Sequence, residues 1–220
     1  GVSSATISKV LNGSWESIAD EMWRSIAAQI GVMAGSADAA GWQVVKTRSY
    51  DVMTFTLRSV QADSLTAAVI GGAGSGKTEA IKNYTAAGRN VYHLVQNMGA
   101  TVAGTTVSDM MDNIVDTLKR KESPLIVLDE ADKLSDQVLY FFISLYNQLE
   151  DQCGIILTAT SNLKARIEKG LRLNRKGYAE IYSRIGRKFV ELPLPNSEDV
   201  AAVCVANGVS DTKTINKIID

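Results

Sequence analysis

A glycine-rich stretch at residues 71–78 carries the residue types that bind a triphosphate. It matches the pattern G-x-x-x-x-G-K-[ST], in which glycines allow backbone N–H groups to converge on phosphate oxygens. In this pattern the Lys77 ammonium reaches the β- and γ-phosphates, and the Thr78 hydroxyl holds Mg²⁺. We therefore expect ATP and Mg²⁺ as ligands. The expected contacts are Gly71, Gly72, Ala73, Gly74, Ser75, Gly76, Lys77 and Thr78.

Two carboxylates directly follow a wholly apolar run at residues 125–128. Ligands of open α/β sheets bind at the carboxyl ends of the strands, so Asp129 and Glu130 are expected to face the phosphates. Asp129 would contact Mg²⁺, directly or through water. Glu130 would act as the base that polarises a water for attack on the γ-phosphate. The alternative is that the two acids only cap the next helix.

The elements around these motifs alternate between strand and helix, which predicts an α/β fold with an open, mainly parallel, five-stranded sheet. A β run enters the glycine-rich loop and a helical pattern leaves it, as the motif requires. We predict strands at residues 67–70, 90–95, 125–128, 155–158 and 188–192. We predict helices at residues 79–87, 108–120, 135–149 and 197–206.

The chain is expected to divide into four parts. Residues 1–31 contain two short helical patterns and form a small N-terminal module. Residues 32–41, rich in Gly, Ala and Ser, are typical of a linker. Residues 42–195 form the core that carries both motifs. Residues 196–220 form a fourth part, with room for one or two helices.

The composition is that of a folded protein, since 45% of the 220 residues are apolar and 21% are charged. Cys153 and Cys204 lie far apart without metal-ligand spacing, which argues against a metal site and a disulfide framework. A reducing, cytoplasmic setting fits this cysteine usage. No apolar run approaches 18 residues, so we expect no membrane association.

Charge is distributed unevenly along the chain although the net charge is only −1. Residues 108–151 carry ten acidic and four basic side chains, a balance of −6, whereas residues 164–188 carry nine basic and two acidic ones, a balance of +7. This asymmetry predicts either a polyanionic partner or head-to-tail packing of unlike faces between subunits. The alternative is a solvated helix face.

The pair Asp129 and Glu130, downstream of the glycine-rich loop, resembles the AAA+ group of P-loop NTPases. Residues 155–162 are similar to that family's sensor-1 strand. The resemblance implies that Asn162 orients the attacking water, with Thr160 as the other candidate. Asn162 is equally compatible with a simple turn.

The segment at residues 182–187 is similar to the arginine-finger segment of the same family. This resemblance implies that Arg184 reaches the γ-phosphate bound to a neighbouring subunit, with Arg187 as the second candidate. Such an arginine stabilises transition-state charge. The alternative is a surface arginine or one that faces DNA.

The first residues, 2–13, resemble the turn and second helix of repressor-type helix-turn-helix domains. In such domains the exposed start of the second helix faces DNA, and here those positions are Ser4, Ala5 and Lys9. Ser4 and Ala5 are too short for bidentate base contacts, so phosphate contacts should dominate. The first half of the motif is missing, which leaves a simple amphipathic helix as the alternative. We expect the chain to be part of a longer protein.

The whole arrangement, including residues 45–50, resembles the Mu B family of DNA-transposition ATPases, relatives of the IstB and TnsC target-selection proteins. The resemblance implies that Arg48 and Tyr50 lie beside the adenine. It also implies ATP-dependent assembly of a homo-oligomeric filament on double-stranded DNA, without strong sequence preference, and delivery of that DNA to a transposase. In the AAA+ family a helical lid with a second sensor arginine usually follows the sheet, but here only residues 196–220 remain and no arginine follows Arg187. Either the helical lid is incomplete, or the protein lacks the second sensor. The expected DNA contacts in the core are Lys164, Arg166, Lys169, Arg172, Arg175 and Lys176.

Two other functions share these motifs. An AAA+ replication initiator or helicase loader has the same core. A helix-turn-helix transcription regulator would use ATP only as a ligand. The small side chains of Ser4 and Ala5 count against operator reading, and Glu130 favours real hydrolysis.

Overall fold

The computed structural model describes residues 42–94 and 107–219. The helix-turn-helix segment with Ser4 and Lys9, and the linker that follows it, lie outside the described residues. Gln43–Asp220 forms one unit, to which all the elements below belong. The division of the chain into module, linker, core and lid stays a prediction.

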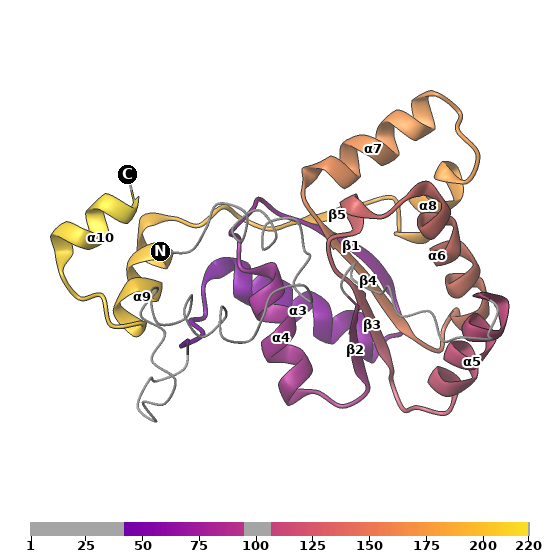
Figure 1. Ribbon diagram of the computed structural model, residues 1–220, viewed down its shortest axis with the longest axis horizontal. Helices are drawn as coiled ribbons and strands as arrows, with labels where there is room; N and C mark the ends of the chain where they lie inside the picture. Colours follow the sequence, from indigo (N-terminus) through magenta and orange to yellow (C-terminus); the bar gives the residue numbers. More distant parts are fainter. Residues whose placement is uncertain (1–41, 95–106, 220) are drawn as a thin grey trace, which may run out of the picture. The chain divides into compact units, whose positions relative to one another are not determined.

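Five short strands form one sheet in which every neighbouring pair is parallel. They are β1 (Thr66–Ile70), β2 (Val91–Leu94), β3 (Leu125–Leu128), β4 (Gly154–Ala159) and β5 (Phe189–Glu191). Their order is β2-β3-β4-β1-β5, so β3, β4 and β1 lie inside the sheet (Figure 1). Every residue of β4 is buried, as a parallel sheet covered on both faces requires. The predicted five-stranded parallel sheet is confirmed.

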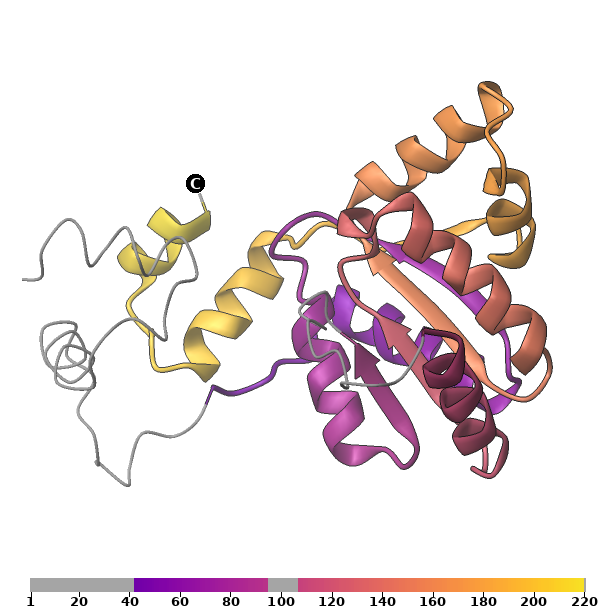
Figure 2. The same ribbon diagram turned by 45° about the vertical axis from the view of Figure 1, so that its right-hand side comes forward.

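Helices cover both faces of this sheet (Figures 1 and 2). Alternate residues of one strand point to opposite faces. Ile156 of β4 therefore packs with one helix pair, whereas Ile155 and Leu157 pack with the other helices. The first face carries α3 (Arg48–Ala62) and α4 (Lys77–Ala87). The second carries α5 (Val107–Lys119), α6 (Asp136–Leu149), α7 (Ser161–Arg172) and α8 (Tyr178–Arg184).

Helix α3 is not predicted by the sequence, although its signals are present. Thr47 caps the helix by accepting a hydrogen bond from the Tyr50 N–H. Met53, Leu57 and Val60, spaced four and three residues apart, bury the inner face. Helices α7 and α8 are likewise additional to the predicted elements, and the segment predicted as a sensor-1 strand continues into α7.

Two helices, α9 (Ser197–Ala206) and α10 (Thr212–Ile219), follow the last strand. The predicted range of the first is confirmed, and a capping box between Asn196 and Asp199 fixes where it begins. Among the described helices, none combines the length and the apolar character needed to cross a membrane.

Candidate nucleotide-binding site

The glycine-rich loop leaves β1 and enters α4, as the motif requires. Gly74 and Gly76 have φ angles of 75° and 80°, which favour glycine. A Cβ atom at either position would meet no atom within 4 Å, so the space above the loop is open. The first N–H groups of α4, which begins at Lys77, have no partner inside the helix, as at the start of any α-helix. The loop therefore has the conformation and the free donors that phosphate binding needs.

The side chain of Lys77 lies across the mouth of this loop. Its Nζ donates to the carbonyl oxygens of Gly71 at 2.8 Å and Gly72 at 2.9 Å, and lies 3.2 Å from Ser75 Oγ. Burial lowers the pKa of the Lys77 ammonium, whereas the Asp129 and Asp132 carboxylates act in the opposite direction. A cation is thus fixed at the place where the motif requires it, and its partners are neutral oxygens that a phosphate can replace.

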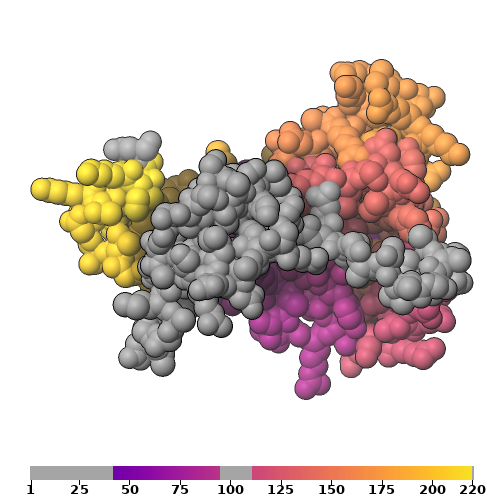
Figure 3. Space-filling model, in the orientation of Figure 1, coloured from indigo at the N-terminus to yellow at the C-terminus, as the bar shows by residue number. Residues whose placement is uncertain are grey.

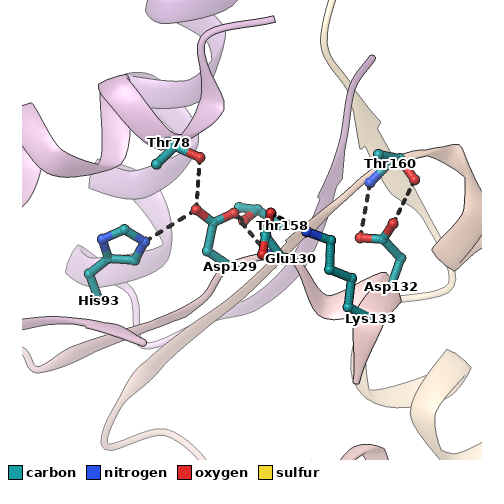
Figure 4. A network of polar contacts seen from close by, with 8 residues as sticks. All are labelled: Thr78, His93, Asp129, Glu130, Asp132, Lys133, Thr158 and Thr160. Carbon is teal, nitrogen blue, oxygen red and sulfur yellow. Dashed lines mark hydrogen bonds and ion pairs between the residues drawn. The ribbon is translucent and has the colours of Figure 1, made fainter. Parts of the chain in front are cut away.

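Asp129, at the end of β3, is the centre of a buried polar network (Figure 4). Thr78 Oγ1 donates to Asp129 Oδ2 at 2.9 Å, and Thr158 Oγ1 of β4 donates to Oδ1 at 2.6 Å. The Glu130 N–H donates to Oδ1 at 2.9 Å, and His93 Nε2 of β2 lies 3.2 Å from Oδ2. Burial alone would raise the pKa of Asp129, but the hydrogen bonds outweigh it and hold that pKa below its ordinary value.

This network fits a magnesium ion. A hydroxyl and an ionised carboxylate, brought together from α4 and β3, are oxygen ligands of the kind Mg²⁺ prefers. Asp129 is only 3% exposed. Its carboxylate nevertheless contacts Thr78, the last residue of the glycine-rich stretch 71–78. The two residues predicted as metal contacts are therefore adjacent in the structure.

Glu130 has an unusual backbone for a residue other than glycine, with φ 56° and ψ 37° in the left-handed region. Its carboxylate accepts a hydrogen bond from Lys133 Nζ at 2.6 Å, and both side chains are about half exposed. Lys133 closes the short helix η2 (Ala131–Lys133) that follows β3. The Glu130 oxygen that accepts from Lys133 is occupied by this contact, so the contact must open before the same oxygen could accept from a water.

The two candidates for orienting water occupy the start of α7. Thr160 caps this helix, with its Oγ1 accepting from the Asn162 N–H at 3.3 Å. Thr160 Oγ1 also donates to Asp132 Oδ2 at 2.8 Å. Asn162 is exposed in the first helical turn. The Thr160 hydroxyl is thus engaged, whereas the Asn162 amide faces outward.

The two candidate arginine fingers differ in their surroundings. Arg184 lies over the Tyr146 ring, 4.7 Å from its centroid, and donates to Asn147 Oδ1 at 3.0 Å. Within the described part of the chain, its Nε is buried and has no hydrogen-bond partner. Arg187 is exposed, at a turn where its φ is 60°. Arg184 therefore packs against α6 of its own subunit, and Arg187 is the more accessible of the two.

The two residues expected beside the adenine contact other parts of the same chain. Arg48 Nε donates to Asp199 Oδ2 at 3.3 Å, and its Nη2 donates to the Leu194 carbonyl at 3.1 Å. The Tyr50 hydroxyl donates to Asn83 Oδ1 at 2.6 Å. Arg48 thus links the start of α3 to α9, and Tyr50 links it to α4. Neither contact brings in the glycine-rich loop.

The six core residues predicted to contact DNA fall into two groups. Lys164 forms an ion pair with Glu191 at 2.7 Å. Arg166 donates to the Leu134 carbonyl at 2.5 Å, to Tyr178 OH at 3.1 Å and to Asp136. The other four are exposed at the end of α7 and the turn into α8, which Figure 3 shows at the surface in orange. They are Lys169, Arg172, Arg175 and Lys176.

Four residues of the site are missing from the predicted set: His93, Thr158, Asp132 and Lys133. Thr158 is a polar residue inside an otherwise apolar strand, and this signal was available in the sequence. His93 is the only histidine in the chain, but its contact depends on β2 lying next to β3. Local patterns do not reveal that strand order.

Comparisons with known proteins support the fold. A family model described as an AAA domain matches residues 87–167. No curated protein matches the chain. Domain III of the replication initiation protein DnaA from Thermotoga maritima is similar in structure, with a TM-score of 0.51 and 16% identity over 80% of this chain and 78% of that chain. The P-loop NTPase domain of a sigma-54 transport activator from E. coli gives a TM-score of 0.36 and 18% identity, over 69% of this chain and 100% of that one. The chain has the AAA+ P-loop NTPase fold.

Proposed function

We propose that the chain binds ATP with Mg²⁺ at residues 71–78 and hydrolyses it. The observation that carries this proposal is the 2.9 Å hydrogen bond from Thr78 Oγ1 to Asp129 Oδ2, between residues 51 positions apart. It joins the last residue of the glycine-rich loop to the first carboxylate after β3. A glycine-rich turn with a chance lysine gives no reason for this contact. The Lys77 ammonium at the mouth of the same loop supplies the cation that the phosphates need.

The proposed roles follow from what each group touches. Lys77 binds the β- and γ-phosphates in place of its present carbonyl partners, and Thr78 with Asp129 holds Mg²⁺. Bound Mg²⁺ would neutralise charge on the phosphate oxygens. Glu130 accepts the proton of the attacking water once it has left Lys133. We expect DNA or a partner protein to stimulate hydrolysis, and separation of Glu130 from Lys133 is one way in which it could do so.

Nucleotide binding and turnover of three purified variants test this proposal. We expect Lys77→Ala to weaken ATP binding strongly. Glu130→Gln should keep ATP binding but lower kcat by about 10²–10⁴-fold, the usual effect of removing a general base. Lys82→Ala is the matched control, because Lys82 is an exposed lysine of the same helix whose ion pair within residues 42–94 and 107–219 is with Glu79. ATP binding that survives Lys77→Ala, or turnover that survives Glu130→Gln, contradicts the proposal.

We further propose that the exposed basic turn binds the phosphates of double-stranded DNA. Four cations lie within eight residues, from Lys169 to Lys176, and none of them forms an ion pair within 4.0 Å with an acidic residue of the described part of the chain. Four phosphate contacts predict a slope of about −3.6 for log K against log salt concentration per subunit. Following the resemblance to the Mu B family, subunits would assemble on DNA when ATP is bound and present that DNA to a transposase.

Assembly would place an arginine of one subunit at the nucleotide of the next. The exposed position of Arg187 favours it over Arg184 for this contact, because Arg184 is already stacked on Tyr146. We expect Arg187→Ala to remove DNA-stimulated hydrolysis while ATP binding by single subunits remains. Arg184→Ala should instead lower the thermal stability. The opposite pattern would make Arg184 the finger.

Electron microscopy with a random-sequence duplex separates the proposed assembly from its alternatives. Filaments that form with ATP on any sequence support target-DNA binding, and their disassembly by an added transposase supports delivery. A ring or loader complex that needs a helicase indicates a replication role. Tight binding to one operator with no assembly contradicts the proposal.

A further inference from the structure

Asp132 is a carboxylate near the phosphate site to which the reaction outlined above gives no role. It lies in η2, two residues after Glu130, and is partly buried. A negative charge so close to Lys77 opposes the approach of an anionic substrate. A contact with Thr160 suggests a role for this carboxylate.

Asp132 holds Thr160 through both carboxylate oxygens. Oδ2 accepts from Thr160 Oγ1 at 2.8 Å, and Oδ1 accepts from the Thr160 N–H at 3.5 Å (Figure 4). The same Thr160 Oγ1 accepts from the Asn162 N–H, so the contact extends to the first turn of α7. Two oxygens on one residue fix both its position and its rotamer.

The contact joins the ends of two neighbouring strands. Leu128 of β3 pairs with Leu157 of β4, so the segments that leave these strands run side by side. Glu130 belongs to the first segment, and Thr160 and Asn162 belong to the second. A further contact, from Arg166 of α7 to the Leu134 carbonyl at 2.5 Å, joins the same two segments beyond the site. The start of α7 is thereby held in a fixed relation to the proposed base.

We propose that Asp132 is a positioning residue for ATP hydrolysis, which acts by holding Thr160 and, through it, the first turn of α7 in register with Glu130. This inference rests on the proposed ATPase function. The contact between Asp132 and Thr160 would control the hydrolysis step. It would leave ATP binding largely unaffected, because Lys77 and Thr78 belong to other elements.

The test compares Asp132→Ala, Asp132→Asn, Thr160→Val and the double variant Asp132→Ala/Thr160→Val. Loss of orientation should lower kcat by about 10- to 100-fold, the range that misplacement of reacting groups produces. The dissociation constant of ATP should change by less than about threefold, since the contacts that hold ATP equally before and during the reaction are not altered. Asp132→Asn should recover most of kcat, because its amide oxygen still accepts from the Thr160 hydroxyl. The double variant should resemble either single one, since both remove the same contact.

Asp211→Ala is the matched control for stability. Asp211 Oδ2 accepts from the Thr214 N–H at 2.9 Å and from Thr214 Oγ1 at 2.7 Å, a similar contact at the start of α10. We expect a similar small loss of Tm in Asp132→Ala and Asp211→Ala, but a loss of kcat only in the former.

Three results would overturn the inference. An unchanged kcat in Asp132→Ala would exclude a positioning role. A parallel loss of kcat, ATP affinity and Tm, shared by Asp132→Asn, would reduce Asp132 to a structural residue. Additive effects in the double variant would show that Asp132 acts independently of Thr160. If the unaltered protein does not hydrolyse ATP at all, the proposed function fails and the inference fails with it, whereas the first three results leave the proposed function intact.

Discussion

Replacing Arg166 with methionine separates a structural role for this residue from a role in DNA binding. Methionine keeps the aliphatic stem but removes the donors to the Leu134 carbonyl, Tyr178 OH and Asp136. A hydrogen bond that involves a charged group contributes about 1.5–3 kcal/mol to stability. Because the Asp136 side chain is 45% exposed, water replaces part of the lost interaction. We therefore expect a loss of about 1–3 kcal/mol of unfolding free energy.

The assays are urea denaturation, thermal unfolding and DNA binding at several salt concentrations. In thermal unfolding of a protein of this size, a loss of about 1–3 kcal/mol corresponds to a fall in Tm of roughly 2–12 °C. Arg172→Met is the matched control, since Arg172 is exposed at the end of the same helix. It should change stability by less than about 0.5 kcal/mol but reduce the salt slope by roughly one.

The reasoning is refuted if the two variants behave alike. Arg166→Met with unchanged stability and a reduced salt slope would mean that the guanidinium leaves Asp136 to bind DNA. The hydrogen-bond network around Tyr178 would then contribute nothing measurable to folding. Equal destabilisation by Arg172→Met would show that the end of α7, and not this network, limits stability.

Three further predictions follow from packing and charge. Gly170→Ala should destabilise the fold by about 1–3 kcal/mol in urea denaturation, because the added Cβ would lie 2.3 Å from the Tyr178 ring; no change would mean that α7 moves freely. Burial raises the pKa of Cys153 to about 12, so in a Cys204→Ser background the native thiol should resist alkylation at pH 9 and react once unfolded; rapid native reaction would contradict this. The pKa of Asp129 is lowered in the folded state, so its stabilising contribution is present above the unfolded value of about 3.9 and is lost as the pH falls through the folded value. Asp129→Asn should therefore flatten the dependence of unfolding free energy on pH below about pH 4, and an unaltered acid limb would refute this.

Local patterns were sufficient where one physical cause dominates. The wholly apolar run at residues 125–128 is found as β3 with the predicted bounds, because strands of a parallel sheet that is covered on both faces are mostly continuous apolar runs. Helix α9 also has its predicted bounds, since Asn196 and Asp199 cap it. Helix α3 is absent from the predicted helices although Met53, Leu57 and Val60 carry helical spacing.

The contacts that local patterns did not predict involve partners that are distant in the sequence. The density of basic residues at 164–188 made Arg166 look like a phosphate contact, but Asp136, 30 residues away, pairs with it. Arg48 likewise meets Asp199, which lies 151 residues further along the chain. Such pairs depend on which helices share a face of the sheet, and composition does not contain that information. The DNA contacts themselves stay predictions.

Because Glu130 has a left-handed backbone, selection for activity and selection for thermal stability should favour different residues at this position. For a residue with a Cβ this conformation costs about 1–2 kcal/mol relative to the right-handed one, and glycine largely avoids that cost. Glu130→Gly should thus yield a protein that survives heat better while it loses the proposed base. A library screened only for thermal survival would enrich glycine at this position, whereas a screen for turnover would retain glutamate. The residue in the strained conformation is then the one to which the proposed chemistry assigns the base.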